Sequence, residues 1–297
     1  MDKLLFIYNA QAGKGQVSTR LAGLLDAFVK AGWQVTVRPT QHKGDAAETA
    51  ARLGDQFDRV VCCGGDGTLH ETVNGLMTLE RRPVLGYIPA GTTNDFARNL
   101  KLPRGYDKRA AVAAAGVPRA CDIGRFNGER HFVYVAAFGA FTDVAYDTPQ
   151  PFKNMFGHFA YLLEGMMRLG SIESYPLTVE HDDGVEEGEY IFGMVSNTVS
   201  VGGIIGLPAS EVALDDGLME VVLVQKPKSA LELQAVITAL MKQDFSAADG
   251  VTGLHTAHLK VASDRPLPWT LDGEYGGAPQ VTEIDACKQA VIIVYGE

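Results

Sequence analysis

Glycine, asparagine and aspartate residues gather in three short polar segments, each of which follows an apolar run typical of a strand. The segments are Asn9–Gly15 (NAQAGKG), Gly64–Thr68 (GGDGT) and Pro89–Asp95 (PAGTTND). Glycines let a backbone approach a phosphate closely, and the free N–H groups at the start of a helix attract an anion. This pattern predicts phosphate-binding turns between strands and helices.

Asp66 in GGDGT is an unusual residue for a phosphate site, because its negative charge repels the ligand. A Mg²⁺ ion between the two would remove this conflict, since Mg²⁺ prefers carboxylate, water and phosphate oxygens. The alternative is a tight turn in which Asp66 caps a helix, and helix capping is also the alternative role of Asn94 and Asp95. The segment Asn9–Gly15 lacks the G-x-x-x-x-G-K-[ST] pattern, so a P-loop NTPase is not indicated, and the alternative for this segment is an ordinary strand-to-helix turn.

The first 125 residues alternate between strand and helix patterns. Strands are expected at residues 4–8, 33–37, 60–63 and 84–88, and helices near 18–31, from 45, after GGDGT and after PAGTTND. Ser18 or Thr19 is the expected cap of the first helix. The ends of parallel strands meet at one edge of such a sheet, where ligands bind. We therefore expect a doubly wound, mostly parallel α/β nucleotide-binding domain over residues 1–125.

After about Asp122, strand-like runs separated by Gly, Pro and Asp turns dominate the sequence. Helical spacing stands out only near residues 156–169 and 230–241. This composition favours antiparallel strands. We expect an antiparallel β-sandwich-like second domain over residues 126–297, whose last strand could return to the first domain.

The chain carries a formal net charge of −10, from 26 Lys and Arg against 36 Asp and Glu. This acidity disfavours binding along a nucleic-acid backbone, so no nucleic-acid partner is expected. The four cysteines form no C-x-x-C pair, and Cys62 and Cys63 lie in an apolar run, which suits buried thiols in the cytoplasm. No stretch approaches the roughly 20 apolar residues of a membrane helix. A cytoplasmic protein is expected.

The pairing of GGDGT (64–68) with GTTNDFAR (91–98) resembles the diacylglycerol kinase catalytic-domain family, bacterial lipid kinases that also resemble sphingosine kinases. GGDGT alone also occurs in NAD kinases and in phosphofructokinase-type folds, whereas the pairing is more specific to the lipid kinases. The resemblance covers nearly the whole chain. Further similar features are Thr40, Gly44–Ala46, Asp122 in CDIG, Gly202, Gly203, Pro208, LDDG at 214–217 and LDGE at 271–274.

The resemblance implies an NAD kinase/diacylglycerol kinase-like fold and a transfer of the γ-phosphoryl group of Mg-ATP to a lipid hydroxyl, with diacylglycerol as the first candidate lipid. The active site would lie between the two domains. The residues that would contact ATP are Asn9, Ala10, Gln11, Ala12, Gly13, Thr40, Gly64, Gly65, Asp66, Gly67, Thr68, Leu69, His70, Thr92 and Asn94.

The resemblance also implies roles for four acidic residues. Asp66, Asp95 and Asp122 would form a network of carboxylates and water around the magnesium of Mg-ATP. Glu274 in LDGE would be the general base, which suits a carboxylate within hydrogen-bond reach of a hydroxyl. Without the resemblance, LDGE is an ordinary hairpin turn, since Asp-Gly favours hairpins.

A second, structural Mg²⁺ is implied in the β-rich domain. Its ligands would be Asp216 and the carbonyls of Ala213 and Leu218. Asp215 and Asp216 are otherwise typical turn residues.

Two positions depart from the family pattern: Ala10 stands where Pro is frequent, and His70 stands where Asn is common. Neither departure removes an acidic group, so an active enzyme is expected. Two other interpretations remain: an NAD kinase-like enzyme, which shares GGDGT, and a nucleotide-binding regulatory protein without turnover.

Two stretches could meet a lipid surface. One is a basic cluster of Arg98, Lys101, Arg104, Lys108 and Arg109, and the other is the aromatic and apolar stretch 152–161. Basic groups attract anionic headgroups by about 1 kcal/mol each near the surface. The alternatives are a solvated helix face and helix packing. We expect transient peripheral contact with the membrane that holds the lipid substrate, and an exposed edge strand could pair in a homodimer.

Overall fold

The computed structural model describes residues 2–139, 173–198, 213–242 and 244–296 of the 297-residue chain. The chain divides into two compact units, Met1–Ile123 together with Lys288–Glu297, and Gly124–Cys287. Two strands, β5 (Val117–Phe126) and β15 (Val281–Tyr295), run from one unit into the other. The C-terminal part of β15 thus belongs to the same unit as the N-terminus.

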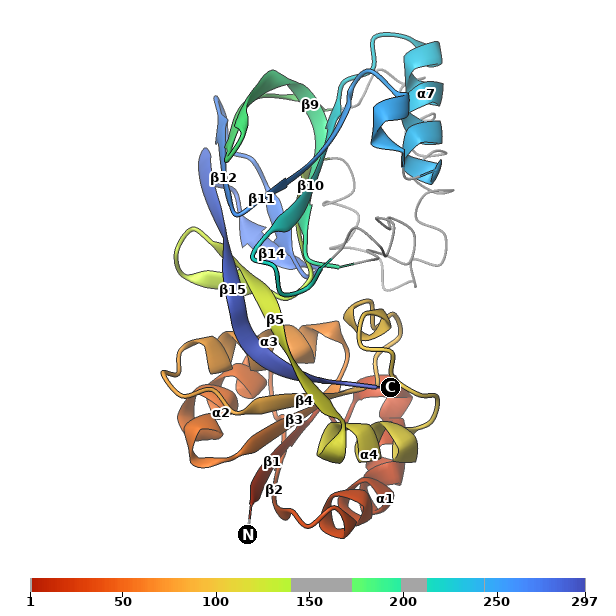
Figure 1. Ribbon diagram of the computed structural model, residues 1–297, viewed down its shortest axis with the longest axis vertical. Coiled ribbons are helices and arrows are strands. Elements are labelled where there is room, and N and C mark those ends of the chain that lie inside the picture. The colour runs from red at the N-terminus through yellow and green to blue at the C-terminus, as the bar shows by residue number, and fades with distance from the viewer. Residues whose placement is uncertain (1, 140–172, 199–212, 243, 297) are drawn as a thin grey trace. The chain divides into compact units, whose positions relative to one another are not determined.

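The first unit is a parallel sheet with helices on both faces (Figure 1). The sheet order is β2-β1-β3-β4-β15, and every described pairing in it is parallel. Helices α1 and α4 contact each other, as do α2 and α3. The strands and helices are β1 (Lys3–Tyr8), α1 (Gln16–Lys30), β2 (Gln34–Pro39), α2 (Asp45–Leu53), β3 (Arg59–Gly64), α3 (Asp66–Met77), β4 (Val84–Pro89) and α4 (Tyr106–Ala115), with 3₁₀ turns at Ala12–Gly15 (η1), Gly54–Gln56 (η2) and Phe96–Arg98 (η3).

The central strand β3 explains why this sheet needs two helical layers. All six of its residues are buried, which is typical of a parallel strand covered on both faces. On the α1 side, Phe6 of β1 contacts Phe28 of α1 edge to face, with ring centroids 5.1 Å apart. Both side chains are fully buried. The predicted doubly wound α/β fold is confirmed.

Two local expectations are wrong. Ser18 and Thr19 lie inside α1, whose N-cap is Gly15 in a left-handed conformation. No α-helix follows PAGTTND directly; only the three-residue 3₁₀ turn η3 forms there. Lys101 takes a left-handed conformation (φ 49°) and Pro103 follows, so the chain cannot continue as a helix before α4.

The C-terminus of α4 shows how buried polar groups are satisfied. The guanidinium of Arg59 donates to the carbonyls of Ala113 (2.9 Å) and Ala114 (2.6 Å). The indole of Trp33 donates to the Ala114 carbonyl as well, at 3.0 Å. Helix ends leave such carbonyls without intrahelical partners, and a cation there also suits the helix dipole. Arg59 of β3 and Trp33, the residue before β2, thereby hold the end of α4.

The second unit consists mainly of antiparallel strands. Its long strand β9 pairs with β8 through its first half and with β7 and β10 through its second half. Strand β9 therefore belongs to two sheets. One has the order β14-β13-β7-β9-β10-β11 and the other has the order β9-β8-β12-β15. The elements are β6 (Arg130–Phe132), β7 (Val135–Gly139), β8 (Tyr175–His181), β9 (Gly184–Ser196), β10 (Met219–Gln225), α7 (Ala230–Lys242), η4 (Phe245–Ala247), β11 (Val251–Thr256), β12 (His258–Ser263), β13 (Trp269–Leu271) and β14 (Glu274–Gly277).

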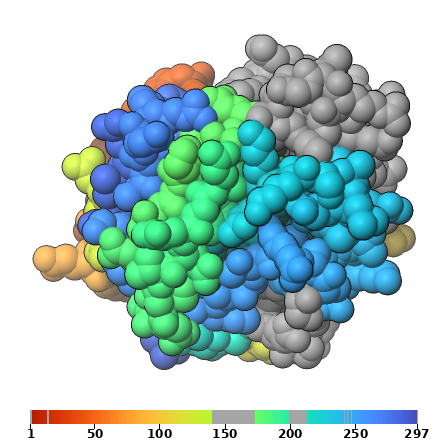
Figure 2. All heavy atoms as spheres, turned by 90° about the horizontal axis from the view of Figure 1, so that it is seen from above, coloured from red at the N-terminus to blue at the C-terminus, as the bar shows by residue number. Residues whose placement is uncertain are grey.

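Both of these sheets contribute to one core. Every second residue of β8 (Tyr175, Leu177, Val179) and of β10 (Met219, Val221, Leu223) points into it, as strand periodicity requires. Trp269 of β13 is fully buried there and contacts Phe126 and Phe138 edge to face. The predicted β-sandwich-like second domain is confirmed. In the space-filling view, strands of this unit and α7 make up most of the coloured surface on this face (Figure 2).

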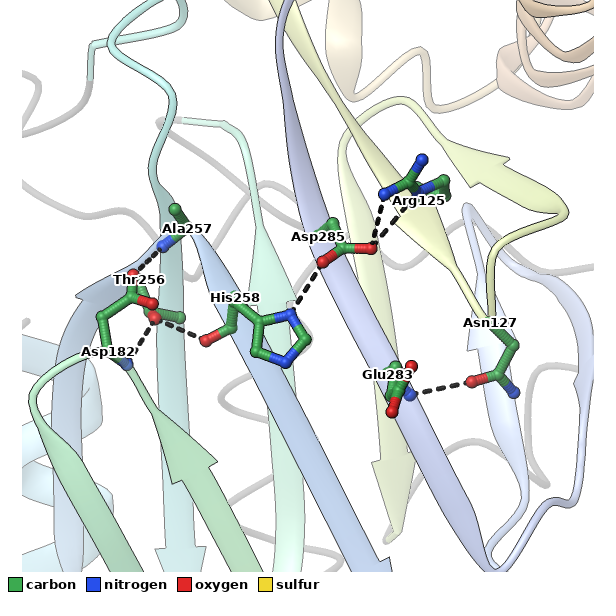
Figure 3. A network of polar contacts seen from close by, with 8 residues as sticks. All are labelled: Arg125, Asn127, Asp182, Thr256, Ala257, His258, Glu283 and Asp285. Carbon is green, nitrogen blue, oxygen red and sulfur yellow. Dashed lines mark hydrogen bonds and ion pairs between the residues drawn. The ribbon is translucent and has the colours of Figure 1, made fainter.

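A network of polar contacts joins β5, β12 and β15 on the outside of the second unit (Figure 3). Arg125 donates to Oδ2 of Asp285 through two nitrogens, at 3.2 and 2.9 Å. The Nδ1 atom of His258 lies 2.7 Å from the other oxygen of Asp285. Asp285 of β15 therefore lies between Arg125 of β5 and His258 of β12.

Candidate nucleotide and catalytic site

The polar turns after β1, β3 and β4 lie side by side. The amide of Asn9 donates to the Cys63 carbonyl (2.9 Å), and the amide of Ala90 donates to the Gly64 carbonyl (2.8 Å). The ladder of the sheet therefore continues past the strands into the turns. The expectation that these segments share one sheet edge is met by the geometry.

Glycine makes this close approach possible. A Cβ on Gly91 would lie 2.6 Å from the Cα of Gly65, so the second and third turns touch backbone to backbone. A Cβ on Gly13 would lie 2.7 Å from the Ala90 carbonyl, and Gly13 also has a φ of 60°. Larger side chains cannot fit at these positions. The result is a cluster of partly exposed glycine backbone that a phosphate could approach.

Helix α3 begins within GGDGT, directly after Gly64 and Gly65. Its N-cap is Gly65, with no hydrogen bond from a capping side chain, so the N–H groups of the first turn are not covered by a cap. Asp66 is the first helical residue and does not cap α3; instead its Oδ2 accepts a hydrogen bond from the amide of Asp95, at 3.1 Å. The contact brings two of the predicted catalytic aspartates onto neighbouring turns. An uncapped helix start favours an anion.

Asn94 closes the third turn on itself. Its Oδ1 accepts from the amide of Gly91 (2.8 Å), and its Nδ2 donates to the Gly91 carbonyl (2.6 Å). Its φ of 53° is one that Asn tolerates better than most residues. The alternative of simple helix capping by Asn94 is therefore wrong. Thr92, at the tip of this turn, is exposed.

Asp122 is fully buried on β5. Its Oδ1 accepts a hydrogen bond from the amide of Gln289 on β15, where Gln289 has a φ of 51°. Within the described ranges, the one set of three potential ligand side chains whose ligand atoms lie within 4.8 Å of one another is His42, Asp45 and Glu48. Asp66, Asp95 and Asp122 are therefore too far apart for all three to bind one ion directly. A network in which water bridges them to the ion stays a prediction.

The chemistry of these donors suits magnesium. Asp66 and Asp95 supply carboxylate oxygens, and the hydrogen bond between them places both beside the glycine turns. Mg²⁺ prefers such oxygens and retains several waters, so it needs only one or two protein carboxylates. Asp66 and Asp95 therefore fit the ion of Mg-ATP.

Sequence reasoning missed Glu71, which holds the loop that carries Thr40. Oε1 of Glu71 on α3 accepts from the amide of Gly44 at 2.8 Å. The amide of Thr40 donates to the Tyr8 carbonyl at 2.9 Å. The loop after β2 is thus tied both to β1 and to the GGDGT helix. A glutamate three residues after GGDGT was the only sequence signal for this contact.

Arg109 was expected in a basic surface cluster, but its guanidinium group is bonded to backbone carbonyls. This partly buried side chain donates to the carbonyls of Pro89 (2.9 Å) and Pro103 (3.0 Å). It therefore supports the start of the PAGTTND turn. Lys101, Arg104 and Lys108 of the cluster are exposed, as a surface role requires.

Cys62 and Cys63 lie in β3, just before GGDGT, and both are completely buried. Burial raises the pKa of the Cys62 thiol to about 12. Burial also raises the pKa of Cys63, and the neighbouring Cys62 adds to the shift. Both therefore remain protonated thiols near neutral pH and are unsuited to act as nucleophiles.

In the second unit, LDGE forms the hairpin between β13 and β14. Leu271 and Glu274 are paired across it, with Asp272 and Gly273 in the turn, both at positive φ. Asp272 is buried, whereas Glu274 is only partly buried. LDGE can thus be a hairpin turn and also carry the catalytic base, because the turn places Glu274 at the first position of β14.

The LDDG segment is also a turn. Oδ1 of the exposed Asp216 accepts from the amide of Leu218 at 2.9 Å, and Gly217 has a φ of 88°. Ala213, the third predicted ligand of a structural ion, is exposed. The family-like Gly202, Gly203 and Pro208, the stretch 152–161 and the expected helix at 156–169 lie outside the described residues.

Comparisons with known proteins identify the family. Residues 3–126 match the family described as the diacylglycerol kinase catalytic domain, and residues 138–294 match the YegS C-terminal NAD kinase beta sandwich-like domain. The diacylglycerol kinase of Bacillus subtilis is 37% identical over 93% of this chain and 91% of its own length. The chain belongs to the diacylglycerol kinase family.

Other relatives agree with this assignment. The diacylglycerol kinase of Staphylococcus saprophyticus is 35% identical over 91% of this chain and 88% of its own length. A crystal structure from Bacillus anthracis, provisionally named a diacylglycerol kinase, superposes with a TM-score of 0.83 at 26% identity and covers 99% of this chain and 95% of its own. The predicted family and fold are thereby confirmed. Across the described part of the chain, no helix has the length and apolar character needed to cross a membrane.

Proposed function

We propose that this diacylglycerol kinase family member transfers the γ-phosphoryl group of Mg-ATP to a lipid hydroxyl, with diacylglycerol as its substrate and phosphatidic acid as its product. The observation that carries the proposal is the contact between the GGDGT and PAGTTND turns, with Asp66 bonded to the amide of Asp95. The family membership and the curated relatives support the same activity.

The nucleotide would bind at the glycine turns of the first unit. Backbone around Gly13, Gly65 and Gly91 can approach the phosphates, and the uncapped start of α3 would stabilise their negative charge. Asp66 and Asp95, with buried Asp122 as an outer member, would hold the magnesium ion through carboxylate oxygens and water. The bound ion would neutralise charge on the phosphate oxygens.

Glu274 would act as the general base. Phosphoryl transfer depends mainly on positioning and charge neutralisation, so the base needs only to accept the hydroxyl proton within hydrogen-bond reach. Its place at the first residue of β14, directly after a rigid hairpin turn, supports this role. Ala213, Asp216 and Leu218 would bind a structural Mg²⁺; they lie in the segment before β10, where Oδ1 of Asp216 accepts from the amide of Leu218.

The substrate lies in a membrane, so the enzyme would bind the surface transiently from the cytoplasm. Lys101, Arg104 and Lys108 are the exposed cations proposed for this contact. Nucleic acid is not a proposed partner, given the net charge of −10. A homodimer would be formed through an edge strand of the second unit; among the described strands, β14 and β11 lie at the two ends of one sheet.

The test is ATP consumption that depends on added lipid in mixed micelles. We expect turnover with diacylglycerol and labelled phosphatidic acid as product, and none with NAD. Sphingoid bases, ceramide, phosphatidylglycerol and undecaprenol complete the panel. Glu274→Gln should reduce kcat by at least about 100-fold while ATP binding persists. Phosphorylation of NAD, or no turnover with any lipid, would refute the proposal.

A further inference from the structure

Asp272 is a carboxylate buried in a hairpin turn. It is only 4% exposed and has a φ of 51°. Aspartate tolerates this left-handed conformation better than most residues, because its short side chain can bond locally. An Asp-Gly hairpin needs no buried carboxylate, and burial of a charge costs free energy unless hydrogen bonds compensate. The burial of Asp272 therefore requires hydrogen bonds that compensate for its cost.

Four hydrogen bonds join Asp272 to residues 133–135, which connect β6 to β7 and include the first residue of β7. Oδ2 accepts from the amide of Val133 at 2.7 Å. Oδ1 accepts from the amides of Tyr134 (3.0 Å) and Val135 (3.1 Å). The amide of Asp272 itself donates to the Val135 carbonyl at 2.8 Å. Hydrogen bonds to an ionised acceptor are about twice as strong as neutral ones, so this clamp fixes the turn firmly.

Glu274 depends on that turn for its position. It lies two residues after Asp272, at the start of β14, and Gly273 between them has open space around it. Among the described strands, β14 pairs with β13 alone and ends its sheet. Glu274 is paired with Leu271 across the turn, so the anchored turn sets where Glu274 lies.

We propose that Asp272 is the positioning residue of Glu274: it anchors the hairpin to the β6–β7 segment, so that the carboxylate of Glu274 is held where it can accept the proton of the lipid hydroxyl. This inference rests on the proposed function, in which Glu274 is the base. Displacement of a catalytic group by about 1 Å can cost about 100-fold in rate. Asp272 need not touch the substrate to control kcat.

Asp272→Asn is the principal test. Asparagine tolerates the same φ and has nearly the same shape, but its NH₂ group cannot accept a hydrogen bond from a backbone amide. At least one of the three accepted bonds is lost. We expect kcat with diacylglycerol to fall about 10- to 100-fold, with KM for Mg-ATP unchanged, because the nucleotide residues lie in the other unit. Amides 133–135 should exchange hydrogen faster in the variant.

The double variant Asp272→Asn/Glu274→Gln separates positioning from general stability. If Asp272 acts through Glu274, the double variant should have the same kcat as Glu274→Gln alone. If Asp272 only supports the fold, its effect should multiply that of Glu274→Gln. Asp182→Asn is the matched control, because Asp182 also accepts from a backbone amide (Ala257) but is exposed and far along the sequence from LDGE. Its kcat should equal that of the wild type.

Each outcome has a defined meaning. Wild-type kcat in Asp272→Asn, or multiplied effects in the double variant, overturns the positioning role and leaves the proposed function intact. No lipid-dependent turnover by the wild type refutes the proposed function, and this inference with it. All assays are run well below each variant's unfolding temperature. Should Asp272→Asn not fold, Asp272→Glu, which keeps the charge and moves it by one methylene, takes its place; failure of both to fold would make the role purely structural.

Discussion

Single glycines decide whether the candidate nucleotide site can form. Gly91 and Gly65 contact each other with no room for a side chain on Gly91, and the side chain of Asn94 bonds to both the N–H and the carbonyl of Gly91. A substituent there must displace the backbone of a neighbouring strand end. The motif glycines are therefore required by contact between turns as well as by any ligand.

We predict that Gly91→Ala lowers the free energy of unfolding by about 1–3 kcal/mol, the usual cost of overpacking. It should also weaken ATP binding at least about tenfold, because the GGDGT turn must shift. Calorimetric titration with Mg-ATP and chemical denaturation measure the two effects. Gly184→Ala is the control: its Cβ would lie 3.8 Å from the nearest side-chain atoms, so neither quantity should change. Unchanged ATP affinity in Gly91→Ala would contradict the packing argument.

At the scale of elements, side chains from one strand or helix fix the place of another. Arg109 of α4 supports the end of β4, Glu71 of α3 holds the loop after β2, and Asp272 anchors the β13–β14 hairpin. In the second unit, Asp285 of β15 bonds to Arg125 of β5 and to His258 of β12 (Figure 3). These contacts join elements that are far apart in the sequence.

Asp285 gives this element-scale contact a pH dependence. Partial burial raises its pKa, but the hydrogen bonds and charges of His258 and Arg125 outweigh burial and hold the pKa below the usual 3.8. A carboxyl with a depressed pKa stabilises the fold above its unfolded pKa, and this contribution is lost as pH falls through the folded pKa.

We predict that Asp285→Asn lowers the free energy of unfolding near pH 6 and that the difference from the wild type closes below about pH 4. Urea denaturation at a series of pH values measures it. Asp183→Asn, a change at an exposed aspartate of the β8–β9 turn, should show no such pH-dependent difference. A constant difference down to pH 2 would show that the charge of Asp285 is not the cause.

At the scale of the whole molecule, net charge and local charge oppose each other. The chain has a formal charge of −10, so an anionic membrane repels it on average. The exposed Lys101, Arg104 and Lys108 form a local exception in the loop before α4 and in its first turn. Arg109, although near in sequence, is bonded to backbone carbonyls and belongs to the fold.

We predict that Arg104→Glu/Lys108→Glu weakens binding to anionic vesicles about tenfold or more at low salt, since each cation near the surface contributes about 1 kcal/mol. The difference should shrink as the salt concentration rises. Arg38→Glu/Arg52→Glu, at exposed arginines of β2 and α2, changes the net charge equally and is the control. Equal weakening by both double variants would indicate a net-charge effect and remove the patch.

The sequence by itself determined the order of strands and helices, the three glycine turns and the family, because hydrophobic periodicity and glycine motifs are local properties of the chain. It failed after PAGTTND, where left-handed Lys101 and Pro103 stop the helix, and it misplaced Arg109 on the surface. Tertiary structure alone decided which groups meet: Asp66 with the amide of Asp95, Glu71 with Gly44, and Asp272 with Val133–Val135. Such hydrogen bonds depend on strand order and register, which bring together residues up to 139 positions apart, and no local pattern encodes them.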